Sequence, residues 1–129
     1  MNDSSIEPEG LEVHVDKILY QYGKPGIPPE TPHIFIYFLT IRNNSNQTVT
    51  LLGRKWVIEN SDGTQLVIEG DKIVGETPTL SPGEEFSYNS FHLADQDSEA
   101  SGSFHGLNSS KRKIHVQIPP FSMIIPGKH

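Results

Sequence analysis

The chain has 129 residues, a formal net charge of −6 and no cysteine. This length favours one domain, which buries enough surface to fold without a disulfide or a metal ion. The lack of cysteine excludes disulfides, thiolate metal sites and cysteine nucleophiles. The negative charge argues against duplex nucleic acid as a partner.

The N-terminal segment, residues 1–10, is acidic and contains no basic residue. A secretory signal needs a basic start followed by an apolar stretch, so we expect none. The longest apolar run, residues 34–39, is far shorter than the about 20 residues that cross a bilayer. We therefore expect a cytoplasmic protein without membrane contact, in which residues 1–10 are flexible and residues 127–129 form a short tail.

Residues 11–16 give the first strand signal, because Leu11, Val13 and Val15 alternate with polar residues. Such alternation is typical of a half-buried strand. The next stretch, residues 24–32, is rich in proline and glycine. Proline removes the amide that a strand ladder needs, so this stretch is expected to be a loop.

Residues 33–42 give the strongest strand signal, because both faces of this strand would be apolar. One face would carry Phe35, Tyr37, Leu39 and Ile41. The other face would carry Ile34, Ile36 and Phe38. Two apolar faces indicate a central strand whose second side is covered. The alternative is an exposed patch that binds a protein partner or serves as the seam of a homodimer.

The middle of the chain predicts a hairpin and a further strand. Residues 48–59 and 65–69 would pair about the Asp62-Gly63 turn. A tight turn at Ser81-Pro82-Gly83 would precede a strand over residues 85–93. We expect three aromatic residues of these strands in the core: Trp56, Phe86 and Tyr88.

The last part of the chain mixes weak and strong signals. Residues 94–101 are polar and are expected to form a mobile loop before a short strand over residues 103–107. Residues 111–118 alternate regularly, with Ile114, Val116 and Ile118 facing inward. Pro119-Pro120 should interrupt the pairing before a short edge strand over residues 121–125. The pattern is all-β, with about seven antiparallel strands arranged as a β-sandwich.

Several short segments, taken in order, resemble the ApaG family. They are Thr40-Ile41-Arg42-Asn43, Leu51-Leu52-Gly53-Arg54 with Trp56, Ile73-Val74-Gly75-Glu76-Thr77-Pro78, Ser81-Pro82-Gly83-Glu84-Glu85-Phe86 and Ile118-Pro119-Pro120-Phe121. The resemblance implies an immunoglobulin/fibronectin type III-like β-sandwich, with residues 11–126 as the ApaG domain. Members of this family have no established enzymatic activity and are linked in phenotype to cobalt tolerance and magnesium traffic. Similar domains look like interaction modules within larger proteins.

The stretch from Gly70 to Gly75 corresponds to a Gly-x-Gly-x-x-Gly loop that has been compared with nucleotide-binding loops. Here Lys72 replaces the middle glycine, and no helix signal follows. The main interpretation is a bend between strands, because such a motif needs its helix. Alternatively, the loop amides bind a phosphate-containing nucleotide, with Lys72 and Arg54 adding positive charge. Arg54 could instead pair with an acid on a neighbouring strand.

A second departure from the family pattern is Phe91, since the family tends to have glycine after the serine at position 90. The six histidines lack zinc-site spacing and are all expected on the surface. No serine elbow or catalytic carboxylate pair is recognisable. We therefore predict no catalytic residue, no cofactor and no metal site.

The sequence as a whole favours a non-enzymatic binding or adaptor domain with a protein partner. The alternatives are a binder of phosphate- or pyrophosphate-containing nucleotides and a protein of divalent-metal (cobalt or magnesium) homeostasis. The candidate ligand residues are Gly70, Lys72, Gly75 and Arg54. The candidate interaction surface consists of Ile34, Ile36 and Phe38.

Overall fold

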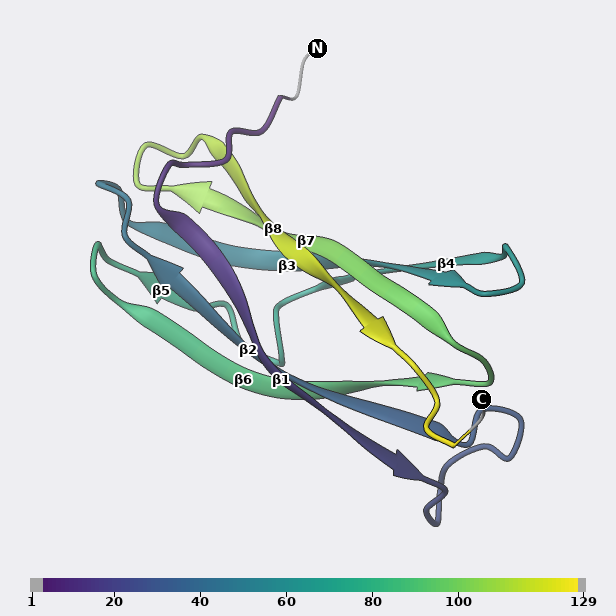
Figure 1. The fold of residues 1–129 in the computed structure, drawn as a ribbon. Helices are drawn as coiled ribbons and strands as arrows, with labels where there is room; N and C mark the ends of the chain where they lie inside the picture. The colour runs from purple at the N-terminus through teal and green to yellow at the C-terminus, as the bar shows by residue number, and fades with distance from the viewer. Residues whose placement is uncertain (1–3, 128–129) are drawn as a thin grey trace.

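The computed structural model describes residues 4–127, which form two β-sheets packed face to face (Figure 1). The strands are β1 (Leu11–Tyr22), β2 (His33–Asn43), β3 (Val49–Asn60), β4 (Gln65–Asp71), β5 (Thr79–Leu80), β6 (Glu85–Ala94), β7 (Ser98–Asn108) and β8 (Lys113–Met123). One sheet has the order β1-β2-β6, and the other has the order β4-β3-β7-β8 with β5 paired to β3. No helix that could span a membrane is found among residues 4–127. The predicted all-β sandwich of antiparallel strands is confirmed, and the two-residue β5 is a strand that the sequence did not predict.

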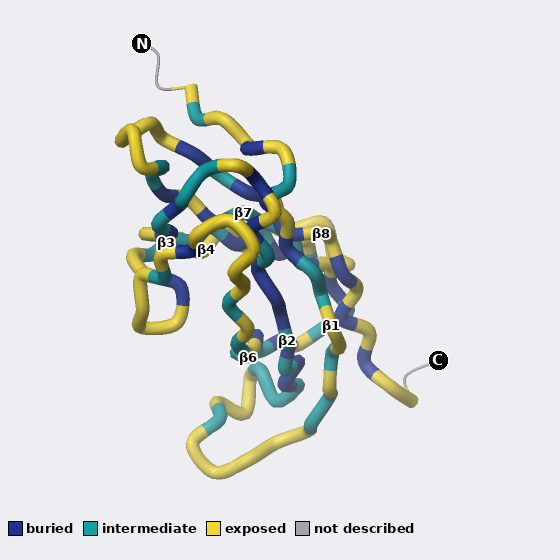
Figure 2. Tube along the Cα trace, turned by 90° about the vertical axis from the view of Figure 1, so that its left-hand side faces the viewer, coloured by how far each residue is buried: buried dark blue, intermediate teal, exposed yellow. Residues whose placement is uncertain are grey.

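The core lies between the inward faces of the two sheets. Its most enclosed apolar side chains, all with an exposed fraction of 0%, are Leu39, Ile41, Val49, Leu51, Ala100, Phe104 and Met123. Trp56 is 2% exposed and its ring centroid lies 4.9 Å from that of Tyr37. Phe86 and Tyr88 are partly buried and pack against this core, as predicted. Figure 2 shows β2 buried along most of its length, which fits a central strand.

β1 is longer than predicted, because a bulge halfway along it shifts the alternation of inward and outward side chains. The register with β2 shifts between Val15 and Lys17, so Asp16 is an extra residue. Before the bulge the inward side chain is Val15, whereas after it the inward side chains include Ile18. A two-residue alternation followed straight through Asp16 therefore loses its phase.

The mobile loop predicted for residues 94–101 is wrong, because β6 ends at Ala94 and β7 begins at Ser98. β7 is a central strand that pairs with β3 on one side and with β8 on the other. A Cβ atom added at Gly102 would overlap the carbonyl oxygen of Lys55 on β3. Close approach of the backbones thus requires small residues here, and small residues give little apolar signal.

Pro119-Pro120 does interrupt the regular pairing with β7, but the separate edge strand predicted after it is wrong, since β8 continues to Met123. The register with β7 runs from Gly102 opposite Ile118 to Ala100 opposite Phe121. One residue of β7 therefore faces both prolines, which sit in a bulge on an edge strand. This is a place where missing amide hydrogens are tolerated.

Part of the N-terminal segment that was expected to be flexible is bonded to β8. The Ile6 amide donates to the carbonyl of Lys113 at 3.1 Å, and the His115 amide donates to the carbonyl of Ile6 at 3.0 Å. The Gln117 amide donates to the Glu7 carboxylate at 2.8 Å. This segment therefore covers part of the outer edge of β8. Residues 1–3 and 128–129, the second pair belonging to the predicted tail, lie outside the described residues.

Candidate functional site

The outer face of the sheet β1-β2-β6 carries the predicted interaction residues. Ile34, Ile36 and Phe38 point to this face because successive side chains of a strand alternate. The strand register places Ile36 opposite Leu19 of β1 and opposite Phe91 of β6. These three side chains therefore form a row across all three strands.

We define the apolar patch as the outward apolar side chains of this sheet: Leu19, Ile34, Ile36, Phe38, Phe91 and Leu93. Leu19 and Phe91 are the most open, with exposed fractions of 43% and 51%. Ile36 and Phe38 are half-buried, and the ammonium of Lys17 lies 4.7 Å from the centre of the Phe38 ring. Of the three predicted residues only Ile34 is buried, at 5%. The expected covering of the second face therefore holds for Ile34 alone.

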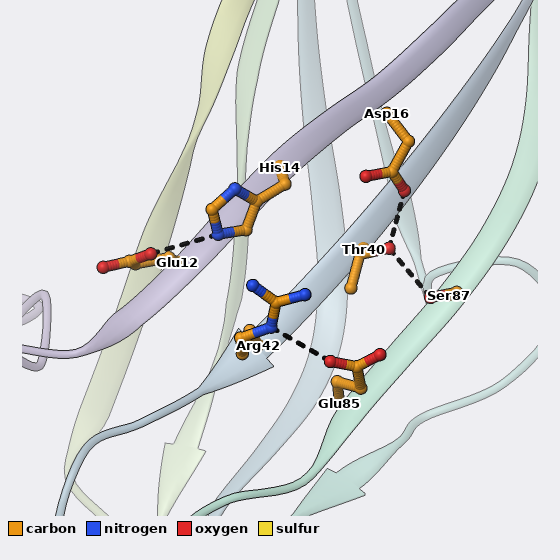
Figure 3. A network of polar contacts seen from close by, with 7 residues as sticks. All are labelled: Glu12, His14, Asp16, Thr40, Arg42, Glu85 and Ser87. Atoms are coloured by element: carbon orange, nitrogen blue, oxygen red, sulfur yellow. Dashed lines mark hydrogen bonds and ion pairs between the residues drawn. The ribbon is translucent and has the colours of Figure 1, made fainter.

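The other half of the same face is polar (Figure 3). The Thr40 hydroxyl donates to the Asp16 carboxylate at 2.6 Å and lies 2.8 Å from the Ser87 hydroxyl. Beside it, Arg42 Nε donates to Glu85 Oε1 at 3.0 Å. Hydrogen bonds thus link side chains of all three strands next to the apolar patch. An apolar area with a polar rim is typical of a surface that binds another macromolecule.

Of the second predicted site, the structure brings Gly70 and Lys72 together with Arg54. Its Nη1 atom donates to the carbonyl oxygens of Asp71 at 2.6 Å and Lys72 at 3.0 Å. A Cβ atom at Gly70 would lie 2.8 Å from Arg54 Nη2, so glycine leaves room for the guanidinium. Arg54 therefore fixes the loop through its carbonyl oxygens, which differs from the acid pairing considered from the sequence.

The loop itself is a bend between β4 and β5, and no helix follows Gly75. Lys72 and Gly75 have φ angles of 68° and 80°, in the left-handed region that favours glycine. The Lys72 amide donates to the carbonyl of Leu52 at 2.6 Å, and the Ile73 amide donates to that of Glu76 at 2.9 Å. Both amides are thus engaged within the protein. Lys72 thus adopts a backbone conformation that favours glycine.

His92 contradicts the expectation that all histidines lie on the surface, since it is only 8% exposed. It lies on the inward face of β6, with its ring centroid 4.7 Å from Trp56 and 4.8 Å from Tyr37. Burial lowers the pKa of His92 to about 4, because the charged form loses its hydration. Within the described part of the chain, His92 Nε2 and the Tyr88 hydroxyl have no hydrogen-bond partner. The alternation that places Tyr88 inward was the signal for His92.

Two further histidines face each other on the outer side of the other sheet. His105 of β7 lies directly opposite His115 of β8, with ring centroids 6.5 Å apart. The hydroxyl of Ser103 lies 2.8 Å from His105 Nε2, and that of Ser5 lies 2.7 Å from His115 Nδ1. No group of three histidine or acidic side chains suited to a metal ion occurs within residues 4–127.

Over most of its length the chain is similar to known proteins of one family. A family described as "ApaG domain" matches residues 26–108. Protein ApaG of Pectobacterium atrosepticum is 36% identical over 101 residues, which cover 78% of this chain and 81% of that protein. Protein ApaG of Deinococcus radiodurans is 39% identical over 93 residues, covering 71% and 73%.

Two solved structures extend the likeness to the fold. A structural genomics X-ray structure has a TM-score of 0.80 and 29% identity, and the match covers 93% of this chain and 90% of that one. A structure described as a putative ApaA protein from Bordetella pertussis has a TM-score of 0.73 and 22% identity, covering 95% and 99%. The second likeness concerns the fold alone. Together with the family match and the identities above, these findings show that the chain belongs to the ApaG domain family.

Proposed function

We propose that this chain is a non-enzymatic binding domain that holds a protein partner on the apolar patch, in the cytoplasm. The observation that carries the proposal is the row of Leu19, Ile36 and Phe91, of which the two outer members are about half exposed. Complete transfer of such a side chain out of water is worth about 1.5–3 kcal/mol, and covering its exposed half supplies roughly half of that. Covering the row would therefore supply a hydrophobic centre, and the polar half of the face would supply its rim.

Phe91 strengthens this proposal because it stands where the family resemblance suggests that glycine is common. A glycine there would leave a gap at the end of the row, whereas Phe91 adds a large aromatic ring that is 51% exposed. Aromatic side chains are enriched at the centres of protein interfaces. We infer that the partner of this chain binds an apolar surface that Phe91 enlarges.

The test is affinity capture from the cytosol of the organism that makes the protein. Phe91→Asp should lose at least one protein that the wild-type chain retains, because a carboxylate would have to be buried in the contact. Ile124→Asp is the matched control, since Ile124 is 49% exposed and lies beyond the end of β8. Far-ultraviolet circular dichroism checks that both variants are folded. Retention of the same proteins by all three chains would contradict the proposal.

A further inference from the structure

The second unusual surface is the free edge of β4, which belongs to the other sheet. Within residues 4–127, β4 is an end strand whose only partner is β3. Its three consecutive apolar residues are exposed, with Leu66 at 52%, Val67 at 47% and Ile68 at 36%. In a two-layer sandwich an end strand normally keeps one face on the core, so exposure of both faces needs an explanation.

The hairpin geometry identifies the backbone groups at this edge. The Asn60 amide donates to the Thr64 carbonyl at 2.9 Å, which makes these residues a hydrogen-bonded pair. Such pairs alternate along an antiparallel ladder, so Leu66 and Ile68 direct their amides and carbonyls to β3. The backbone groups of Gln65, Val67 and Glu69 consequently point away from the sheet.

β4 also lacks several of the features by which exposed edges avoid pairing, and its charged residues, Glu69 and Asp71, lie at its C-terminal end. It contains no proline, no lysine and no bulge in its register with β3. At the opposite end of the sheet, β8 carries two prolines in a bulge, and Ile6 bonds to its edge. The two end strands of this sheet are therefore protected to different degrees, and the edge of β4 is the more accessible to another strand.

We propose that β4 pairs antiparallel with β4 of a second copy of this chain, about a two-fold axis at Val67. In this register Val67 lies opposite Val67 of the second copy, and Leu66 lies opposite its Ile68. Gln65 lies opposite Glu69 of the second copy. The outward backbone groups of these odd-numbered residues then meet, forming about six hydrogen bonds.

The residue order of β4 favours this register and a second copy as the occupant. The apolar residues are symmetric about Val67, so each one meets an apolar residue and no like charges are opposed. Centring the axis on Glu69 would place two carboxylates opposite each other, which is unfavourable. Pairing Val67 with Glu69 would place a carboxylate against an apolar side chain and leave Leu66 opposite Gly70. The strand is thus self-complementary in charge and polarity.

The first test is sedimentation velocity on the wild-type chain across a range of concentrations. We expect a monomer–dimer equilibrium that Val67→Lys shifts to monomer by at least about tenfold in dissociation constant, since lysine on an edge opposes pairing. Val74→Lys is the control, because Val74 is 40% exposed and lies after β4. A wild-type chain that stays monomeric at every concentration would overturn the proposal. A dimer insensitive to Val67→Lys would overturn it as well.

The second test uses the absence of cysteine from the chain. Val67→Cys should form a disulfide-linked dimer on mild oxidation, because opposed residues of a hydrogen-bonded pair have Cα atoms about 5.5 Å apart. Gln65→Cys should not, since the two copies of residue 65 would be roughly 13 Å apart in this register. Equal cross-linking of both variants would rule out the Val67 axis.

This inference is independent of the partner proposed for the apolar patch, since the two surfaces belong to different sheets. Phe91→Asp should therefore leave the dimer unchanged. If Phe91→Asp abolishes the dimer and Val67→Lys does not, the two copies meet through the apolar patch and the β4 pairing is wrong.

Discussion

The two end strands of the five-stranded sheet, β4 and β8, are built for opposite surroundings. β8 places Ile114, Val116 and Ile118 in the core, each no more than 2% exposed. β4 has Leu66 and Ile68 in the corresponding inward positions, and both are exposed. The two strands have similar apolar content, so composition alone does not decide which end is buried.

This difference shows where the sheet β1-β2-β6 stops covering the sheet that contains β4 and β8. Ile68 lies beside Trp56 in the register of β3 and β4, yet Trp56 is 2% exposed and Ile68 is 36% exposed. The core therefore ends between these two neighbouring strands. The apolar residues beyond that boundary contribute little to folding, which leaves them available for contacts outside the chain.

The largest expected effect comes from replacing one isoleucine by alanine in each of the two end strands. Ile118→Ala should destabilise the protein by about 2–5 kcal/mol, because it leaves a cavity in the core. Ile68→Ala removes the same atoms at the other end and should cost less than about 1 kcal/mol. Urea unfolding, followed by the fluorescence of the single tryptophan Trp56, measures both. Similar losses for the two variants would mean that β4 shares the core.

Sequence reasoning predicted the strands whose large side chains alternate without interruption. A register shift between Leu51 and Gly53 breaks the alternation of β3. The core positions of β2, and those of β8 up to Ile118, follow directly from alternation, and so do the second-face residues Ile34, Ile36 and Phe38. It failed at Asp16, where a bulge changes the phase, and at Gly102, where close strand approach requires a small residue. Neither feature leaves a periodic signal in one chain.

The sequence predicted the residues that each strand contributes to the two candidate sites, but not how residues of different strands meet. Leu19 and Phe91 join Ile36 through the register of three strands, which alternation within one strand does not specify. Likewise, nothing in the spacing of Arg54 and Lys72 indicates that the guanidinium binds the carbonyl oxygens of the loop. His92 is different, because its position in β6 predicted burial while its residue type suggested the surface.

The next expected effect tests the boundary of the core through His92, whose ring packs on Trp56. Its pKa of about 4 lies below the value of about 6.5 expected in the unfolded chain. Between those values the unfolded state binds more protons, so stability should fall as the pH falls. We expect a loss of about 2 kcal/mol between about pH 7.5 and about pH 5.

The variant His92→Phe is the control for that dependence, because it keeps an aromatic ring beside Trp56 and Tyr37 but does not titrate. Its free energy of unfolding, measured in urea at several pH values, should vary less over the same interval. A wild-type profile that is flat, or one that His92→Phe reproduces, would show that the imidazole is hydrated and does not belong to the core.

The smallest effect concerns the bend that follows β4, where Lys72 has a φ of 68°. Lys72→Gly should raise the free energy of unfolding by about 0.5 kcal/mol, because relief of left-handed strain outweighs the added freedom of the unfolded chain. Gly75→Ala should lower it by about 1 kcal/mol, since φ there is 80° although no atom would contact the added Cβ within 4 Å.

The same pair of variants separates a conformational role of this loop from a phosphate-binding role. If Lys72 serves a ligand, pyrophosphate should raise the melting temperature of the wild-type chain and fail to do so for Lys72→Gly. If the loop is only a bend held by Arg54, pyrophosphate should leave both melting temperatures unchanged. In that case the glycine variant is simply the more stable protein, and the bend after β4 owes its shape to its backbone conformation and to the contacts of Arg54.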